Sequence, residues 1–213
     1  MTTLLLRLQA PMQSWGISSL FTERDSAREP SKSGVVGLIC AAQGRSRQAD
    51  LADLTALRMG VRVEREGTLE YDFQTARNIY SADGLSSDKS VISNRYYLAD
   101  AAFLVGLEGA RETLAQIQTA LKNPKWSLYL GRKAFPPGMP LILPDGLREQ
   151  PLFDALKDYP ALVENSPQLK RLIIENEEGE ILRQDVPINF AKREFGSRHI
   201  SIVYVGQPAQ EGG

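Results

Sequence analysis

The stretch Ala101-Ala-Phe-Leu-Val-Gly-Leu107 is apolar throughout, and it follows a shorter segment of mixed character, Arg95-Tyr-Tyr-Leu98. A continuous apolar run of this length predicts a β-strand that is buried on both faces. The run from Thr3 to Leu8, which is closed by Pro11, predicts a second strand. The chain is therefore expected to build its core on a β-sheet.

Three stretches predict helices. Residues 34–44 carry apolar side chains on one face, with Ser31 among the candidate N-cap residues before them and Gly44 as the stop. Residues 110–122 repeat apolar side chains at intervals of three or four and predict another helix. A short helical piece is predicted over residues 50–58, where leucines recur at a spacing of three.

The remaining pattern gives the order of the elements. Residues 61–73 alternate apolar and charged side chains around Gly67, which predicts a strand or hairpin with one wet face. Residues 75–94 break the pattern with turn-forming residues, and residues 140–144 predict a short strand. Strand, helix, strand, strand, helix, strand is the order of a ferredoxin-like βαββαβ domain, also called RRM-like.

The expected fold class is α+β, with two domains. The ferredoxin-like domain occupies residues 1–144 and carries an insertion at about residues 75–97. Residues 145–213 are expected to form a small C-terminal domain of antiparallel β-strands, built from Leu169 to Glu175, Glu180 to Val186 and His199 to Val205.

Composition excludes several classes of protein. The chain has 213 residues, a formal net charge of −1, one cysteine and one histidine. One cysteine cannot form an internal disulfide, and Cys40 lies in an apolar stretch that predicts a buried, inert thiol. The longest apolar run is eight residues, too short to span a membrane, and the N-terminus lacks the features of a signal peptide. We expect a cytoplasmic protein with no membrane partner.

Charge is distributed unevenly along the chain. Residues 1–135 hold 17 basic and 14 acidic side chains, whereas residues 136–213 hold 8 and 12. The stretch from Lys122 to Lys133 carries four positive charges, no acid and two aromatics, a composition that suits phosphate contacts and base stacking. A mixed-charge surface without a nucleic-acid partner would have a similar composition, so both interpretations stay open at this point.

Several residues admit a functional and a structural interpretation. The segment Ser31-Lys-Ser-Gly34 resembles part of a P-loop but lacks the glycines of that motif, which disfavours ATP. It could seat a phosphate at a helix N-terminus, or simply cap the helix. Trp15 and Trp126 could stack on bases or fill the core. Arg95 could bind a ligand or be a solvated edge charge, while the loop from Gly131 to Lys133 favours phosphate contact.

Catalytic and metal chemistry find little support in the sequence. His199 is the only histidine and lies in a predicted strand, and a metal site would have to be built from carboxylates. We therefore predict no catalytic residue, no metal and no cofactor.

Four blocks of sequence together resemble one known family. They are Pro11-Met-Gln-Ser-Trp-Gly16, Pro30-Ser-Lys-Ser-Gly34, Arg95-Tyr-Tyr-Leu-Ala-Asp-Ala-Ala-Phe103 and Tyr129-Leu-Gly-Arg-Lys133. In order and spacing they are similar to the CasD family, a subunit of the subtype I-E CRISPR Cascade complex in the RAMP superfamily. The resemblance implies a thumb hairpin inserted in the ferredoxin-like domain, at the insertion located above.

The resemblance also implies a function. The protein would be a non-catalytic scaffold that binds the 5′ handle of CRISPR RNA (crRNA), docks the backbone and large subunits of Cascade, and meets target DNA only through the complex. The RNA-binding residues implied are Gln13, Trp15, Arg24, Arg28, Ser31, Lys32, Ser33, Gly34, Arg77, Arg95, Tyr96, Lys125, Gly131, Arg132 and Lys133.

Two alternatives stay open. Some relatives of another subtype cut RNA with Tyr, Lys and His together, which makes a metal-independent endoribonuclease of CRISPR repeat RNA the main alternative. Here Ala134 follows Lys133, and His199 is distant in sequence, so that activity would lack its base. An enzyme acting on small molecules on the same fold is a more distant possibility.

Overall fold

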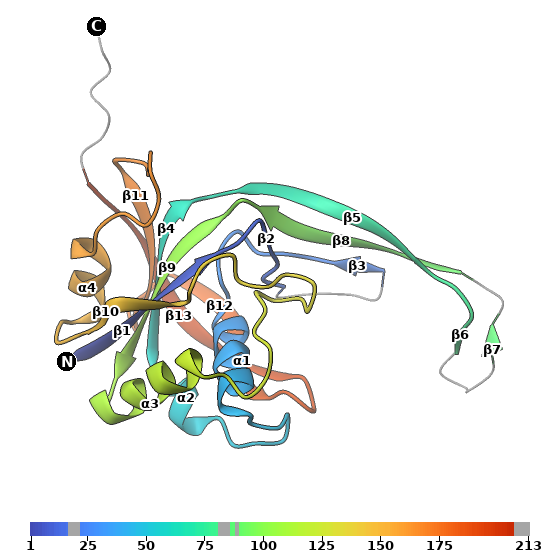
Figure 1. Ribbon diagram of the computed structural model, residues 1–213, viewed down its shortest axis with the longest axis horizontal. Helices are drawn as coiled ribbons and strands as arrows, with labels where there is room; N and C mark the ends of the chain where they lie inside the picture. The colour runs from blue at the N-terminus through green and yellow to red at the C-terminus, as the bar shows by residue number, and fades with distance from the viewer. Residues whose placement is uncertain (17–21, 81–85, 88–89, 207–213) are drawn as a thin grey trace, which may run out of the picture.

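The computed structural model describes residues 1–16, 22–80, 86–87 and 90–206 (Figure 1). Its main feature is a seven-stranded antiparallel sheet in the order β10-β1-β9-β4-β11-β13-β12. The strands are β1 (Thr2–Gln9), β4 (Arg58–Arg65), β9 (Ala102–Gly109), β10 (Ile142–Arg148), β11 (Lys170–Glu175), β12 (Ile181–Asn189) and β13 (Glu194–Val205).

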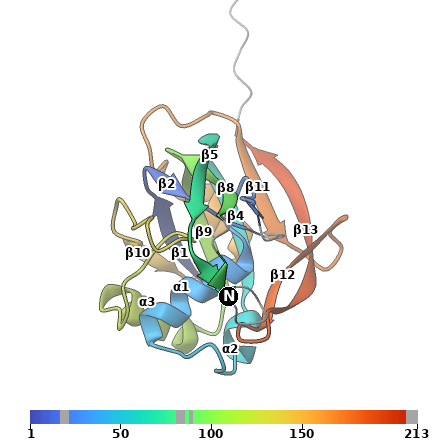
Figure 2. The same ribbon diagram turned by 90° about the vertical axis from the view of Figure 1, so that its right-hand side faces the viewer.

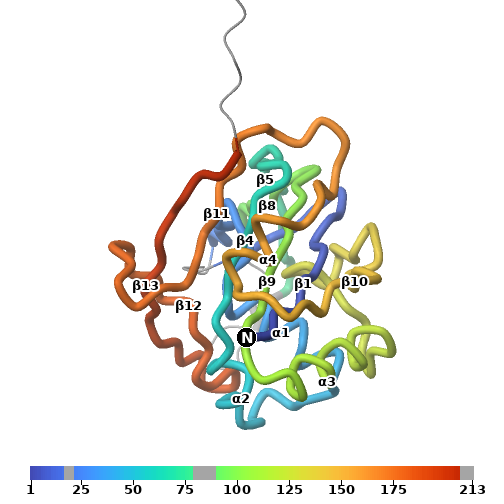
Figure 3. The backbone as a smooth tube through the Cα atoms, turned by 90° about the vertical axis from the view of Figure 1, so that its left-hand side faces the viewer, coloured from blue at the N-terminus to red at the C-terminus, as the bar shows by residue number. Residues whose placement is uncertain are grey.

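Helices cover both faces of this sheet, so the fold is α+β. The helices are α1 (Lys32–Gln43), α2 (Ala52–Thr55), α3 (Arg111–Lys122) and α4 (Leu152–Asp158). One core forms where α1 and α3 pack on the sheet, and a smaller one forms under α4 on the opposite face (Figures 2 and 3). None of the helices in the described part of the chain could span a membrane.

The inner strand β9 agrees with its sequence pattern. β9 pairs with β1 on one side and β4 on the other, and its residues from Ala102 to Val105 are fully buried. In β1 the leucines divide between the two cores: Leu4 and Leu6 face α1 and α3, whereas Leu5 faces α4. An apolar run without alternation is required because both faces of these strands are covered.

The ends of α1 are also as predicted. Ser31 is the N-cap, and its hydroxyl accepts a hydrogen bond from the backbone N–H of Gly34 (3.3 Å). Gly44 ends the helix with φ of 70°, a left-handed conformation that glycine adopts without strain. The piece predicted over residues 50–58 is shorter, since only α2 is helical, although Leu51, Leu54 and Leu57 are all buried.

A long hairpin leaves the body of the molecule (Figure 1). Its arms are β5 (Thr68–Ala76) and β8 (Val91–Ala99), which pair over nine residues, and the short strands β2 (Met12–Gln13) and β3 (Glu23–Arg24) also pair with β8. Beyond the arms lie β6 (Ile79–Tyr80) and β7 (Ser86–Ser87). Strand pairing thus extends into residues 75–94, of which 81–85 and 88–89 lie outside the described residues.

The expectation of one wet face over residues 61–73 was wrong, because these residues divide between β4, which is almost wholly buried, and β5, which is exposed on both faces. Tyr71 and Phe73 were expected on the buried face of their strand, yet they are 60% and 59% exposed. Their alternation with charges is real, but β5 has extended beyond the body of the protein, where no helix covers it (Figure 1).

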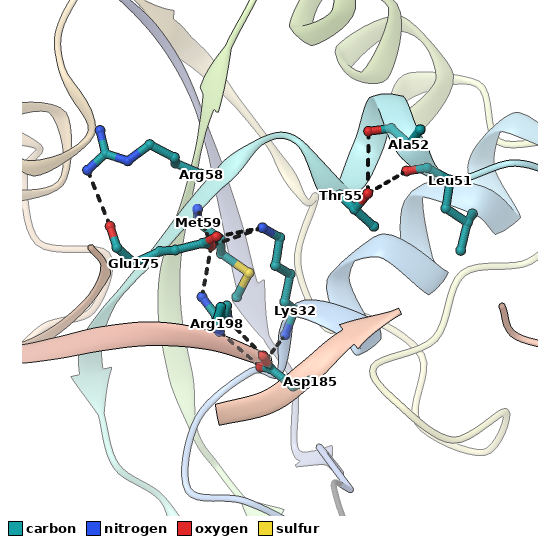
Figure 4. Close-up of polar contacts among 9 residues, drawn as sticks. All are labelled: Lys32, Leu51, Ala52, Thr55, Arg58, Met59, Glu175, Asp185 and Arg198. Atoms are coloured by element: carbon teal, nitrogen blue, oxygen red, sulfur yellow. Dashed lines mark hydrogen bonds and ion pairs between the residues drawn. The ribbon is translucent and has the colours of Figure 1, made fainter. Parts of the chain in front are cut away.

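The C-terminal strands continue the main sheet, because β11 pairs directly with β4. β10 runs through residue 144, where the sequence analysis divided the chain. The junction between the N- and C-terminal parts also contains a buried ionic network (Figure 4). Asp185 accepts hydrogen bonds from the backbone N–H of Lys32 (2.8 Å) and from Arg198, while Glu175 accepts from the Lys32 ammonium (2.8 Å).

This network ties the start of α1 to three strands of the sheet. Asp185 and Lys32 are each 1% exposed, so neither charge is solvated by water. Burial lowers the pKa of the Lys32 ammonium, although the charge of Glu175 acts in the opposite direction. Arg198 also donates to Glu175 (3.2 Å), so removing one acid would leave the buried cations only partly compensated.

We predict that Asp185→Ala lowers the free energy of unfolding by about 3–5 kcal/mol, because Arg198 loses its bidentate partner and keeps only Glu175, and the first turn of α1 loses its anion. Glu180→Ala, an exposed acidic residue nearby in sequence, is the matched control and should change it by less than about 0.5 kcal/mol. Urea denaturation of both variants measures the difference. Equal unfolding free energies for the two variants would contradict the structural role given to Asp185.

Candidate nucleic-acid interface

The segment Gln13-Ser14-Trp15 forms a buried junction at the base of the hairpin. The Gln13 side-chain amide donates hydrogen bonds to the carbonyl oxygens of Leu8 (3.2 Å) and Ala101 (2.8 Å), and the indole N–H of Trp15 donates to Gln13 Oε1 (3.2 Å). Gln13 is fully buried and Trp15 is 1% exposed. We call these three residues the Gln13–Trp15 junction.

Three separate segments are attached to this junction by hydrogen bonds. The backbone N–H of Ser14 donates to Leu130 O (3.1 Å), and the Ser14 hydroxyl donates to Tyr96 O of β8 (3.1 Å). The carbonyl oxygen of Trp15 accepts from the N–H of Ala27 (2.9 Å). The loop after β3, strand β8 and the loop after Leu130 are therefore held around one fixed point.

Strand β3, strand β8 and the loop after Leu130 each carry an arginine, and the three guanidinium groups gather. Arg24 on β3 lies directly opposite Arg95 on β8 in a parallel strand pair. Arg132 Nη2 donates to the carbonyl oxygens of Tyr96 (2.8 Å) and Arg24 (3.3 Å), which brings the third guanidinium to the same place. We call Arg24, Arg95 and Arg132 the arginine cluster.

The cluster is electrostatically unfavourable by itself, since like charges directly opposite each other in a strand pair repel. Burial lowers the pKa of the Arg132 guanidinium, and the positive charges of Arg95 and Arg24 lower it further, against the opposing influence of Asp72 and Asp25. Arg132 nevertheless stays protonated at neutral pH because its ordinary pKa is so high. An anion bound at this position would relieve the repulsion.

A tight loop fixes the position of Arg132. Its guanidinium lies over the ring of Phe135, 5.6 Å from the centroid. The loop is closed by the backbone N–H of Leu130, which donates to Phe135 O (2.8 Å), and by that of Phe135, which donates to Arg132 O (2.9 Å). Gly131 has φ of 90°, and a Cβ at that position would overlap the carbonyl oxygen of Ser14. Only glycine therefore permits this approach of the loop to the junction.

Other predicted residues are buried and do not offer their side chains to a ligand. Lys32 was expected to contact phosphate, but its ammonium is held by Glu175 inside the protein. The helix N-terminus that was a candidate phosphate seat already binds an anion, the Asp185 carboxylate. Burial likewise removes Gln13 and Trp15 from the surface, so these expected contacts are corrected to supporting roles.

The residues at the start of α1 also stabilise the fold through buried contacts. Ser31 is buried and caps the helix, and its hydroxyl lies 3.3 Å from that of Ser33. Gly34 lies against the Trp15 ring, where a Cβ would come within 2.8 Å of a ring carbon. This glycine lets the tryptophan pack on the helix.

The remaining predicted residues are accessible but are not all brought together. Arg28, Lys125 and Lys133 are exposed, and Lys133 follows Arg132 directly in the same loop. Arg77 is exposed just after β5. Tyr96 is half-buried on β8, with its ring 5.9 Å from that of Tyr71.

The structure also distinguishes between the two interpretations that the sequence allowed for several residues. Trp15 fills the core, whereas Trp126 is 52% exposed. Cys40 is buried as predicted, and burial raises the pKa of its thiol to about 11, which disfavours the reactive thiolate. His199 lies on β13, and its Nδ1 is 2.9 Å from the carbonyl oxygen of Gly179. Within the described ranges, no three potential metal ligands converge.

Sequence reasoning missed two kinds of residue. Ser14 connects two arginine-bearing segments, yet a single serine between motif residues gives no signal of its own. Tyr71 and Phe73 form an exposed aromatic face of the hairpin. The charges that alternate with them indicated a strand, but only the three-dimensional structure shows that neither face is covered.

Comparison with known proteins now assigns the family. The family described as "CRISPR-associated protein (Cas_Cas5)" matches residues 3–201. The chain belongs to this family. It is 34% identical over 158 residues to the CRISPR system Cascade subunit CasD of Escherichia coli (strain K12), an alignment that covers 66% of this chain and 69% of that protein.

Two solved structures are similar to this member of the Cas5 family. One, described as a crystal structure of a Cas protein, has 47% sequence identity and a TM-score of 0.81, and the match covers 96% of this chain and 95% of that one. The other, from a CRISPR RNA-guided surveillance complex, has 34% identity and a TM-score of 0.79, with 97% and 91% of the two chains covered.

The loop geometry generates a prediction about Gly131. Gly131→Ala should lower the free energy of unfolding by about 2 kcal/mol or more, because its Cβ would overlap Ser14 and a positive φ is strained for alanine. Gly37→Ala in α1 is the matched control. Its Cβ would make an ordinary contact with Phe190, 3.7 Å away, so a small gain of about 0.5–1 kcal/mol is expected.

Chemical denaturation measures both changes. If Gly131→Ala proves as stable as the Gly37→Ala control, the close approach of this loop to the Gln13–Trp15 junction is not a real constraint.

Proposed function

We propose that this chain is a non-catalytic subunit of a CRISPR RNA-guided surveillance complex, in which it binds the 5′ handle of crRNA and caps one end of the backbone. Membership of the Cas5 family and the likeness to CasD support the assignment to such a complex. The arginine cluster is the single observation that supports RNA binding.

The cluster has the chemistry that RNA phosphates require. Guanidinium groups donate in a fixed fork that matches phosphate oxygens, and three of them converge, with Asp72 and Asp25 opposing the positive charge around Arg132. Lys133 extends the positive surface along the same loop, and Tyr96 places an aromatic ring nearby on β8. Phosphate contacts and base stacking are the two interactions by which proteins bind single strands.

The strand order supports a ferredoxin-like domain within the sheet. Strands β10, β1, β9 and β4 lie side by side and antiparallel, which corresponds to the spatial order 4-1-3-2 of a βαββαβ unit. In this proposal the β5–β8 hairpin is the thumb, and its exposed Tyr71 and Phe73 would contact the backbone subunit of the complex. Residues 1–144 would carry the RNA contacts, while residues 145–213 would support α1 through Asp185 and Glu175.

Cleavage of RNA is the second candidate function, and the position of His199 weighs against it. A metal-independent ribonuclease needs a general base near the scissile phosphate, most often histidine. His199 is on β13 beside Leu182 of β12, whereas the arginine cluster is on β3, β8 and the loop after Leu130. The two groups therefore sit on different sheets.

We predict that the full-length chain binds single-stranded repeat RNA with strong salt dependence. Three phosphate contacts should give a slope of about −2 when the logarithm of the binding constant is plotted against the logarithm of salt concentration. Arg24→Ala, Arg95→Ala and Arg132→Ala should each weaken binding by about 1.5–3 kcal/mol and make the slope shallower.

Arg111→Ala is the control for charge. This arginine is exposed at the start of α3, where it pairs with Glu149, and its loss should leave the affinity unchanged. Fluorescence anisotropy over a series of salt concentrations gives both quantities. An affinity independent of salt, or an equal loss with Arg111→Ala, would argue against the arginine cluster as the RNA site.

We also predict that the chain leaves repeat RNA intact in EDTA and that His199→Ala binds RNA as the wild type does. Gel analysis of end-labelled RNA tests this. Cleavage at one defined bond that disappears in His199→Ala would replace the scaffold function by the endoribonuclease alternative.

A further inference from the structure

A hollow of about 540 Å³ lies between the C-terminal end of α1 and the helix α3. Its walls combine small apolar groups with three carboxamides and one lysine. The lining residues are Ala42, Gln43, Ala115, Gln116, Thr119, Ala120, Asn123 and Lys125. The volume lies within the range typical of sites for small organic groups.

One polar atom of the hollow has an unused hydrogen-bonding capacity. The side-chain oxygen of Gln43 is buried and accepts no hydrogen bond from any of the described residues. A buried acceptor without a donor is costly, and the N–H of a ligand would satisfy this oxygen once the Gln43 side chain turns toward the opening of the hollow. Gln116 and Asn123 add further amide groups, which both donate and accept.

The segment that borders the hollow is fixed and basic. The backbone N–H groups of Lys125 and Trp126 donate to the carbonyl oxygens of Ala42 (2.9 Å) and Ala41 (3.2 Å) at the end of α1. Trp126 nonetheless leaves 52% of its surface exposed. The segment from residue 122 to residue 133 contains four basic and no acidic residues, and it leads to Arg132 of the arginine cluster.

We propose that this hollow and Trp126 bind one unpaired nucleobase of the RNA strand whose phosphates contact the arginine cluster. Trp126 provides a surface for base stacking, Gln43 accepts a hydrogen bond from a base N–H, and Lys125 neutralises the adjoining phosphate. Arg132 lies six positions after Trp126, and even an extended chain spans only about 20 Å over that length, which a few nucleotides can cover. The inference rests on the proposed function because it needs an RNA strand at the cluster.

Charge favours RNA over a protein partner as the occupant. An exposed tryptophan marks a binding surface of either kind, but a segment with only positive charges is the arrangement that single-stranded nucleic acid requires. Carboxamide groups beside an apolar wall suit the flat, polar-edged shape of a base. A protein partner would instead need acidic groups to match Lys122, Lys125 and Lys133.

Tryptophan fluorescence tests the proposal directly. The chain has two tryptophans, and Trp15 is buried in the junction beneath the arginine cluster, so the part of the quenching that is lost in Trp126→Ala reports Trp126. The probe is a single-stranded RNA oligonucleotide of the CRISPR repeat, added to the full-length protein. We expect quenching, together with a roughly tenfold loss of affinity in Trp126→Ala, within the range for one stacked base. Tyr204→Ala, an exposed aromatic on β13, is the control and should bind as the wild type does.

Gln43→Leu removes the acceptor and keeps the volume of the side chain. It should weaken binding several-fold while leaving the quenching of Trp126 in place, because stacking does not need the hydrogen bond. A ribose-phosphate oligomer without bases should bind Trp126→Ala and wild type equally.

The outcomes separate this inference from the proposed function. If Arg132→Ala weakens binding but Trp126→Ala and Gln43→Leu bind RNA as the wild type does, the nucleobase site is refuted and the RNA-binding function stands. If the wild type binds no RNA, both fail. If Trp126→Ala lowers only the incorporation of the chain into the assembled complex, the surface belongs to a protein partner and the nucleobase assignment is overturned.

Discussion

The buried hydrogen bonds of the Gln13–Trp15 junction are the constraint on which the rest of the site depends. Gln13 uses both ends of its amide inside the protein, and Ser14 reaches two other segments with its N–H and its hydroxyl. Breaking one of these bonds would leave a polar group unsatisfied in the core, which costs more than the bond itself contributes. Three arginines from distant parts of the chain are thereby held together despite their mutual repulsion.

A second buried network, formed by Lys32, Glu175, Asp185 and Arg198, fixes the start of α1 on the sheet. Asp185 supplies the anion that the helix N-terminus attracts, and Glu175 supplies the one that Lys32 requires. The C-terminal strands are therefore part of the support for the N-terminal helix against which Trp15 packs. The proposed ligand-binding residues are instead the arginines at the base of the hairpin, where Asp72 and Asp25 compensate the charge of Arg132 only in part.

Local patterns in the sequence predicted the elements but not their partners. The apolar run of β9 and the caps of α1 were predicted correctly, because periodicity and capping act over a few residues. The sequence predicted a phosphate contact for Lys32 and not its burial, because its acidic partners Glu175 and Asp185 lie 143 and 153 residues further along the chain. β3 is only two residues long, so no pattern could show that Arg24 pairs with Arg95.

The central claim is that the arginine cluster holds the phosphate backbone of crRNA. A single-particle reconstruction of the chain assembled with crRNA and its partner subunits tests it most directly. We expect this reconstruction to place phosphate groups within hydrogen-bonding distance, about 2.7–3.2 Å, of the guanidinium groups of Arg24, Arg95 and Arg132. A reconstruction in which the RNA passes elsewhere, with the cluster covered by protein or open to solvent, would contradict it.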